Sequence, residues 1–163
     1  QPYGSAAMPH PTGVVDNTLR SMPKPFLDFL IPKLLKNYNV IYMGAHEFHD
    51  SKTFKPDPNP SLREWAAIIS ECDYFIGCDT CGQHMRMCFD KDASVMIAGT
   101  HEKNTSYPEK FHIIKKDLPF QPDAMRVSMF QYQLSTRLNE ERLNFTIEEM
   151  EKAYQEIVQR IES

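Results

Sequence analysis

Short apolar runs alternate along this chain with longer segments whose apolar residues recur every three or four positions. The mostly apolar runs predict buried β-strands at residues 40–43, 74–77, 95–98 and 111–114. A further short strand is expected at residues 6–8, before a turn. Helical spacing predicts helices at residues 22–37, 61–73, 82–89 and 146–161, and Pro32 should bend or restart the first of them.

Two of these helices begin with a specific local signal. Ser61 is followed three residues later by Glu64, and Thr146 by Glu149, so each pair can form a capping box. The polar segment 45–60, which contains three prolines, is expected to be a loop.

Alternation of short buried strands with helices predicts the fold class. We expect an α/β, Rossmann-like three-layer domain with a mostly parallel sheet and a helical C-terminal tail. Residues 1–122 would form the Rossmann-like part, and the helices in 123–163 would pack on it as one structural domain. Ligands of such sheets bind at the carboxyl ends of the strands, so the loops 11–20, 78–84 and 99–107 are the places to look for a site.

Composition narrows the function classes. The chain has 163 residues, 41% of them apolar and 25% charged, with a net charge of −4. This balance supports one packed core and argues against a nucleic-acid binder. Apolar stretches are too short to span a membrane, and four cysteines favour a reducing, cytoplasmic location. We expect Gln1 to begin a trimmed or excised piece.

The strongest local chemistry follows the strand at 74–77. Asp79 and Thr80 come directly after it, then Cys81 and Gly82 open a short helix, with His84 in its first turn. Small residues there allow an anion to approach the backbone, and the helix presents unpaired N–H groups and its positive dipole end. The Thr80 hydroxyl and the His84 ring add donors for a phosphate or a sugar.

This segment resembles the donor-binding domain of the lipopolysaccharide heptosyltransferases, glycosyltransferase family 9, which have the GT-B fold. The family pattern is a helix ending in an acidic residue, a strand, then Asp-Ser/Thr-Gly-x-x-His. Residues 61–84 follow it in order, and the family's Gly-x-Thr region resembles Gly99 and Thr100 after the next strand. Arg20, two residues before Met22-Pro23, resembles a family cation that precedes an aromatic-Pro pair. Cys81 departs from the usual glycine, as Met22 does from Trp.

The resemblance implies a function. A nucleotide-diphosphate sugar would lie across the strand ends, with the diphosphate held by Asp79, Thr80, Cys81 and Gly82 and neutralised by Arg20. His84 would contribute a further donor. Thr12, Gly13 and Thr100 would add backbone or hydroxyl donors to the phosphates. No metal or other cofactor is expected. The acceptor, a sugar or glycolipid, and the general base would belong with an N-terminal GT-B domain not present here, so this piece of a glycosyltransferase would be inactive alone.

Simpler roles stand beside these. Asp79 could only cap a helix, Arg20 could be a surface cation, His84 could bond locally, and residues 12, 13 and 100 could form plain turns. A non-catalytic binding module for a protein or carbohydrate partner is the alternative function.

Two ligand-rich clusters suggest metal or redox chemistry as a weaker hypothesis. One comprises Cys78, Cys81, His84 and Cys88, and the other His46, Glu47, His49 and Asp50. The apolar stripe at 147–161 would be available for homodimer formation if no partner domain covers it.

Overall fold

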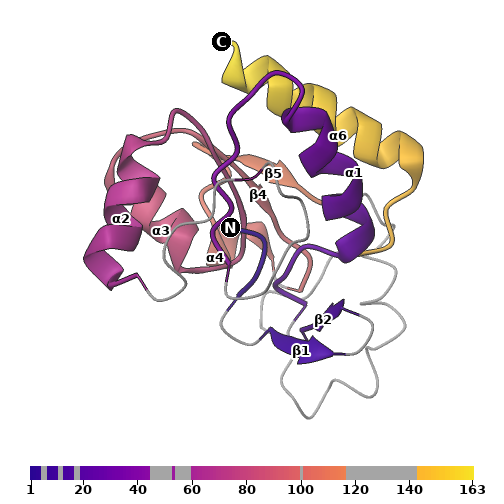
Figure 1. The fold of residues 1–163 in the computed structure, drawn as a ribbon, viewed down its shortest axis with the longest axis horizontal. Coiled ribbons are helices and arrows are strands. Elements are labelled where there is room, and N and C mark those ends of the chain that lie inside the picture. Colours follow the sequence, from indigo (N-terminus) through magenta and orange to yellow (C-terminus); the bar gives the residue numbers. More distant parts are fainter. Residues whose placement is uncertain are drawn as a thin grey trace.

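Helices and strands alternate along most of the chain (Figure 1). The computed structural model describes residues 1–4, 7–10, 13–16, 19–44, 53, 60–99, 101–116 and 143–163. In chain order the elements are β1 (Met8–His10), β2 (Gly13–Val15), α1 (Lys24–Leu34), α2 (Leu62–Glu71), β3 (Phe75–Cys78), α3 (Cys81–Cys88), β4 (Ala93–Met96), α4 (Glu102–Thr105), β5 (His112–Ile114) and α6 (Ile147–Ile161).

The central sheet is parallel, as predicted. Its strand order is β3-β4-β5, and Gly77 of β3 lies opposite Val95 of β4, which lies opposite Ile113 of β5. Three of the predicted strands are therefore confirmed, each displaced by one or two residues. Helix α3 connects β3 to β4, and α4 lies between β4 and β5, so this part of the chain is an α/β domain.

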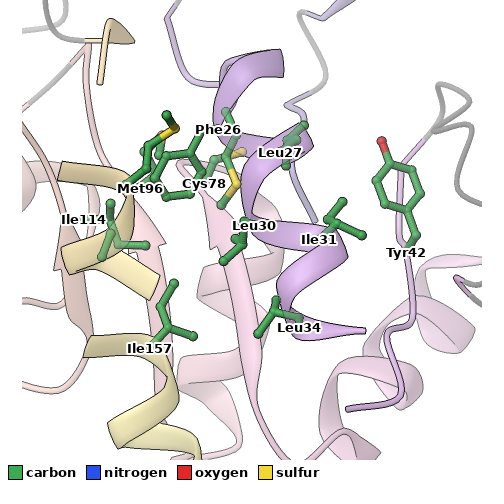
Figure 2. Close-up of a cluster of buried hydrophobic side chains, with 13 residues drawn as sticks. Phe26, Leu27, Leu30, Ile31, Leu34, Tyr42, Cys78, Met96, Ile114 and Ile157 are labelled. Carbon is green, nitrogen blue, oxygen red and sulfur yellow. The ribbon is translucent and has the colours of Figure 1, made fainter. Parts of the chain in front are cut away.

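Helices cover both faces of the sheet. On one face, α1 and α6 pack against Cys78, Met96 and Ile114 (Figure 2). On the other, Ile69 of α2 joins a second core, whose strand residues are Phe75, Ala93, Val95 and the following Ile97. Successive strand residues point to opposite faces, which is why such short runs are apolar throughout.

The capping boxes predicted at the starts of α2 and α6 are both confirmed. Glu64 N donates to Ser61 Oγ at 3.3 Å, and Ser61 N donates to Glu64 Oε2 at 2.8 Å. Thr146 and Glu149 make the same pair of bonds at the start of α6, at 3.2 and 2.7 Å. Each box satisfies N–H groups that have no partner within the helix.

Helix α1 contains Pro32 within its bounds and ends two residues later, at Leu34. Pro32 and Asp28, whose carbonyl loses its helical donor, both lie on the exposed face of the helix. Water can satisfy that carbonyl, so the helix tolerates the proline.

One strand prediction is wrong, and another is confirmed only as a strand, displaced by two residues and outside the parallel sheet. Met8–His10 pairs antiparallel with Gly13–Val15 in a separate two-stranded sheet, so the first strand is not part of the parallel sheet. Residues 40–43 form no strand of that sheet either: Ile41 makes an isolated bridge and is 41% exposed. Tyr42 and Met43 are buried, so the apolar run reflects side-chain packing rather than strand pairing.

Helix α6 packs along α1, with Met150, Ala153 and Ile157 buried against it and the sheet, while Ile147 is exposed. The predicted domain boundary at residue 122 and most of the predicted loop at 45–60 lie outside the described residues. Within the described ranges, none of the helices has the length and apolar character that crossing a bilayer requires.

Candidate functional site

Arg20 and Asp79, which are 59 positions apart in sequence, meet at the carboxyl end of β3. Arg20 Nε donates to the Asp79 carbonyl oxygen at 2.9 Å and to Oδ2 at 3.1 Å. Arg20 Nη2 donates to Oδ1 at 3.3 Å. The Asp79 side chain is 4% exposed and that of Arg20 22%. Two of the predicted site residues therefore form a side-on ion pair, the geometry at which arginine binds carboxylates most specifically.

This pairing leaves part of the guanidinium without a partner. In the described part of the chain, Arg20 Nη1 makes no hydrogen bond to protein, and the side chain's hydrogen bonds all go to Asp79. Guanidinium has five N–H donors in a rigid plane. Asp79 thus holds one edge of that plane, and donors on the other edge have no partner among the described residues.

Thr80 stands at the N-cap position of α3. Among the residues that the structure describes, its side chain makes no capping hydrogen bond, and its buried Oγ1 has no hydrogen-bond partner. The residue as a whole is only 3% exposed. A buried hydroxyl without a partner is costly, and such groups are uncommon in folded proteins. It lies next to N–H groups that a helix leaves unbonded in its first turn.

Gly4 lies against the same cluster. A side-chain carbon built on Gly4 would be 3.5 Å from Thr80 Cγ2, 3.8 Å from Asp16 Oδ2 and 3.9 Å from Arg20 Cβ. Asp16 Oδ2 also accepts a hydrogen bond from Ser21 Oγ at 2.6 Å. Two carboxylates and one guanidinium therefore gather at the start of α3, and sequence reasoning missed Asp16.

The backbone that delivers Arg20 is strained. Leu19 has φ of 55°, in the left-handed region that residues with a side chain seldom adopt. Leu19 N donates to the Asp16 carbonyl at 3.0 Å. Strain of this kind persists where surrounding contacts enforce it, and it often accompanies binding sites. Here it turns the chain so that the next side chain reaches Asp79.

Gly82 has a packing reason to be glycine. A side-chain carbon at this position would lie 2.8 Å from the Phe75 ring and 2.1 Å from Gln1 Oε1. The small residue thus makes room for the chain's own side chains, and its contact with a phosphate stays a prediction. Cys81, beside it, is exposed at the first position of α3.

His84 is exposed and bonds toward the loop after α4. Its Nδ1 lies 2.9 Å from the Tyr107 hydroxyl, and the two rings meet edge to face with centroids 5.7 Å apart. The described contacts of His84 do not include Arg20 or Asp79. The structure therefore joins His84 to another carboxyl-end loop.

Gln83 is a member of the site that sequence reasoning missed. It is fully buried, and its Nε2 donates to Asp79 Oδ1 at 3.2 Å and to the Thr105 carbonyl at 2.8 Å. Its Oε1 accepts from Ser106 Oγ at 2.6 Å. Glutamine is usually exposed, so the sequence carried no signal for this position.

The other predicted ligand residues are placed differently. The prediction that Gly13 lies in a strand-to-helix loop is wrong, because Gly13 belongs to β2 and pairs with His10 of β1. Thr12 and Thr100 lie outside the described residues, as does the cluster His46, Glu47, His49 and Asp50.

The cysteine cluster does not converge. Cys78 is buried, and burial raises the pKa of its thiol to about 12, whereas Cys81 and Cys88 are exposed at opposite ends of α3. Among the residues that the structure describes, no three His, Cys, Asp or Glu side chains are grouped to hold a metal ion.

Together these residues define an α/β domain with a polar cluster at the carboxyl edge of a three-stranded parallel sheet. Comparison of the chain with protein-family models, with curated proteins and with solved structures finds no match in any of the three.

Proposed function

We propose that this chain is the nucleotide-sugar-binding part of a GT-B glycosyltransferase resembling the lipopolysaccharide heptosyltransferases. The observation that carries the proposal is the Thr80 hydroxyl at the start of α3, beside the Arg20–Asp79 pair, which is buried and has no partner in the described part of the chain. A ligand that brings a phosphate oxygen to this point would satisfy Thr80 Oγ1 and the first N–H groups of α3 together.

Arg20 fits the same ligand. Its outer edge has donors in one plane, which suits the two oxygens of a phosphate. As the bond between the sugar and the diphosphate breaks, negative charge grows on the departing oxygen. Donors fixed in advance by Asp79 stabilise that charge without having to reorganise. The chain's own residues thereby supply the electrostatic part of transfer, with no bound metal in the proposed mechanism.

The remainder of the reaction is assigned to other parts of a GT-B enzyme. An N-terminal domain would supply the general base and bind the sugar or glycolipid acceptor. This chain alone should therefore bind a donor and transfer little of it.

A second candidate rests on the carboxylates. Among the described residues, Asp16 lies near Gly4 and Arg20, and Asp79 pairs with Arg20, so two carboxylates accompany one guanidinium. Carboxylates accept hydrogen bonds from sugar hydroxyls, so the same cluster could serve a non-catalytic carbohydrate-binding module. Heat of binding with glucose or galactose, and none with nucleoside diphosphates, would favour this candidate.

The decisive experiment replaces one hydroxyl. Isothermal titration calorimetry of the wild type with ADP, UDP and GDP should show binding in the micromolar to millimolar range for at least one of them. Thr80→Val keeps the shape but removes the hydroxyl, so it should weaken that binding by about 1 kcal/mol, roughly fivefold. Because Oγ1 has no partner in the free protein, the same change should leave thermal stability equal or higher.

Thr146→Val is the matched control. Thr146 is also an N-cap threonine, but its hydroxyl accepts a bond from Glu149 N. This variant should lose about 1 kcal/mol of unfolding free energy and keep the wild-type affinity. Absence of heat with all three nucleotides at millimolar concentration, or equal affinity of Thr80→Val and the wild type, would contradict the proposal.

A further inference from the structure

A short chain of hydrogen bonds connects two carboxyl-end loops of the sheet through Gln83. Ser106 Oγ donates to Gln83 Oε1, and Gln83 Nε2 donates both to the Thr105 carbonyl and to Asp79 Oδ1. Asp79 Oδ1 also accepts from Arg20 Nη2. One side-chain amide therefore lies between the loop that follows β4 and the ion pair that follows β3.

The three partners determine which way the amide faces. An ionised carboxylate and a backbone carbonyl accept hydrogen bonds only, so both must face the amide nitrogen. The Ser106 hydroxyl then donates to the amide oxygen. With the side chain fully buried, water cannot replace any of these bonds without a rearrangement of both loops.

We propose that Gln83 is a positioning residue for ligand binding: it holds the Asp79 carboxylate in the orientation that presents Arg20 to a diphosphate. This role rests on the proposed function, because it requires Arg20 to bind the ligand. It assigns a role to the last unspecified position of the Asp-Ser/Thr-Gly-x-x-His pattern, and it makes the segment containing Thr105 and Ser106 part of the site's support.

The proposal makes the charge at position 83 critical. In Gln83→Glu, an ionised carboxylate would face the Asp79 carboxylate across the distance that an N–H now bridges. Mutual repulsion and burial both favour the protonated form of the new carboxyl group, so its pKa should lie above the usual range. Once protonated, it can again donate to Asp79 Oδ1, although it has one donor where glutamine has two.

The test measures the dissociation constant of inorganic pyrophosphate by calorimetry at pH 5.5 and pH 8, for the wild type and Gln83→Glu. The ratio of the two constants removes the titration of pyrophosphate itself. We expect Gln83→Glu to bind at least tenfold more weakly than the wild type at pH 8, and within about threefold of it at pH 5.5. Circular dichroism at both pH values verifies that each protein is folded at the temperature of the titration.

Gln155→Glu is the matched control. Gln155 Nε2 also donates to a carboxylate four residues earlier, Glu151 Oε1 at 3.0 Å, but on the exposed face of α6. The ratio of the pyrophosphate dissociation constants of Gln155→Glu and the wild type should be close to one at both pH values. Ser106→Ala removes the donor to Gln83 Oε1 without introducing charge, and it should weaken binding two- to threefold at both pH values.

The outcomes separate the two proposals. If the wild type does not bind pyrophosphate or a nucleoside diphosphate, the proposed function fails and this inference fails with it. If the wild type binds but the ratio for Gln83→Glu is the same at both pH values, or matches that of Gln155→Glu, only the role of Gln83 is overturned. If Gln83 had a purely structural role, the ratio of dissociation constants between Gln83→Glu and the wild type would be the same at pH 5.5 and pH 8 as long as the variant remains folded.

Discussion

The two edges of the parallel sheet hold their polar groups in opposite ways. At the amino-terminal edge, the buried Arg86 donates to the carbonyls of Ile69, Cys72, Asp73 and Asp92, at 2.8 to 3.0 Å. At the carboxyl edge, Arg20 bonds only to Asp79 and leaves Nη1 without a protein partner among the described residues. The guanidinium of Arg86 is bonded to four backbone carbonyls of the fold, whereas that of Arg20 retains N–H donors that none of the described residues bind.

Other polar side chains at the amino-terminal edge are also hydrogen-bonded within the protein. Tyr74, Ser94, His112 and Glu156 form one hydrogen-bonded chain from the start of β3 to α6, with links of 2.8 to 3.1 Å. Burial lowers the pKa of His112, and its bond to Glu156 only partly offsets that effect. Each of these four side chains has a hydrogen-bond partner within the protein, as a stabilising network requires.

The carboxyl edge differs from this saturated network at Thr80, whose buried hydroxyl has no partner among the described residues. Unsatisfied donors and a strained residue, Leu19, occur together at this edge. The comparison teaches that burial of a polar residue is not by itself a sign of function. At the edge that we propose binds a ligand, the fold leaves hydrogen-bonding capacity of Arg20 and Thr80 unused among the described residues.

The largest expected effect belongs to the saturated edge. Arg86→Leu leaves four buried or half-buried carbonyls without their donor, so we expect the unfolding free energy to fall by about 3 kcal/mol or more. Urea denaturation followed by circular dichroism measures it. Arg63→Leu, on the exposed face of α2, should change stability by less than about 0.5 kcal/mol.

Arg86→Leu should also keep the wild-type affinity for pyrophosphate at a temperature where it remains folded. If it lost binding while Arg20→Leu retained it, the assignment of the two edges would be reversed.

A smaller effect distinguishes the two ends of α3. Cys81 and Cys88 are both exposed, at the first and last positions of the helix. Alkylation by iodoacetamide at pH 8, read at each cysteine by mass spectrometry, should slow at Cys81 by twofold or more when pyrophosphate is added, and should not change at Cys88. Cys78 should stay unlabelled until the protein unfolds, because it is buried and its thiol pKa is raised to about 12. Equal protection of Cys81 and Cys88 would point to a general stabilisation of the fold and not to a ligand at the start of α3.

The parts of the fold that could be predicted are those that depend on local chemistry. The capping boxes at Ser61 and Thr146 depend on residues three positions apart, and the parallel strands show as short apolar runs. The run at 40–43 misled, because an apolar run signals burial but does not specify which backbone pairs with it. Its side chains contact the cores without joining the parallel sheet.

The candidate site was predictable only in part. The order of Asp79 and Thr80 after a strand, with Arg20 near an earlier helix, pointed to residues that the structure brings together or leaves unsatisfied. Gln83 and Arg86 could not be found in this way, since their burial depends on carbonyls and hydroxyls from distant segments. Polar residues in a short helix are expected to face solvent, and only tertiary contacts override that expectation.

The most direct measurement of the central claim observes both arginines in one experiment. Nitrogen–proton correlation spectra of the arginine Nε–Hε groups, assigned with Arg20→Lys and Arg86→Lys, follow each side chain during a titration with pyrophosphate. The account predicts that the Arg20 signal shifts in a saturable manner while the Arg86 signal remains in place. An Arg20 signal that stays fixed at millimolar pyrophosphate would contradict it.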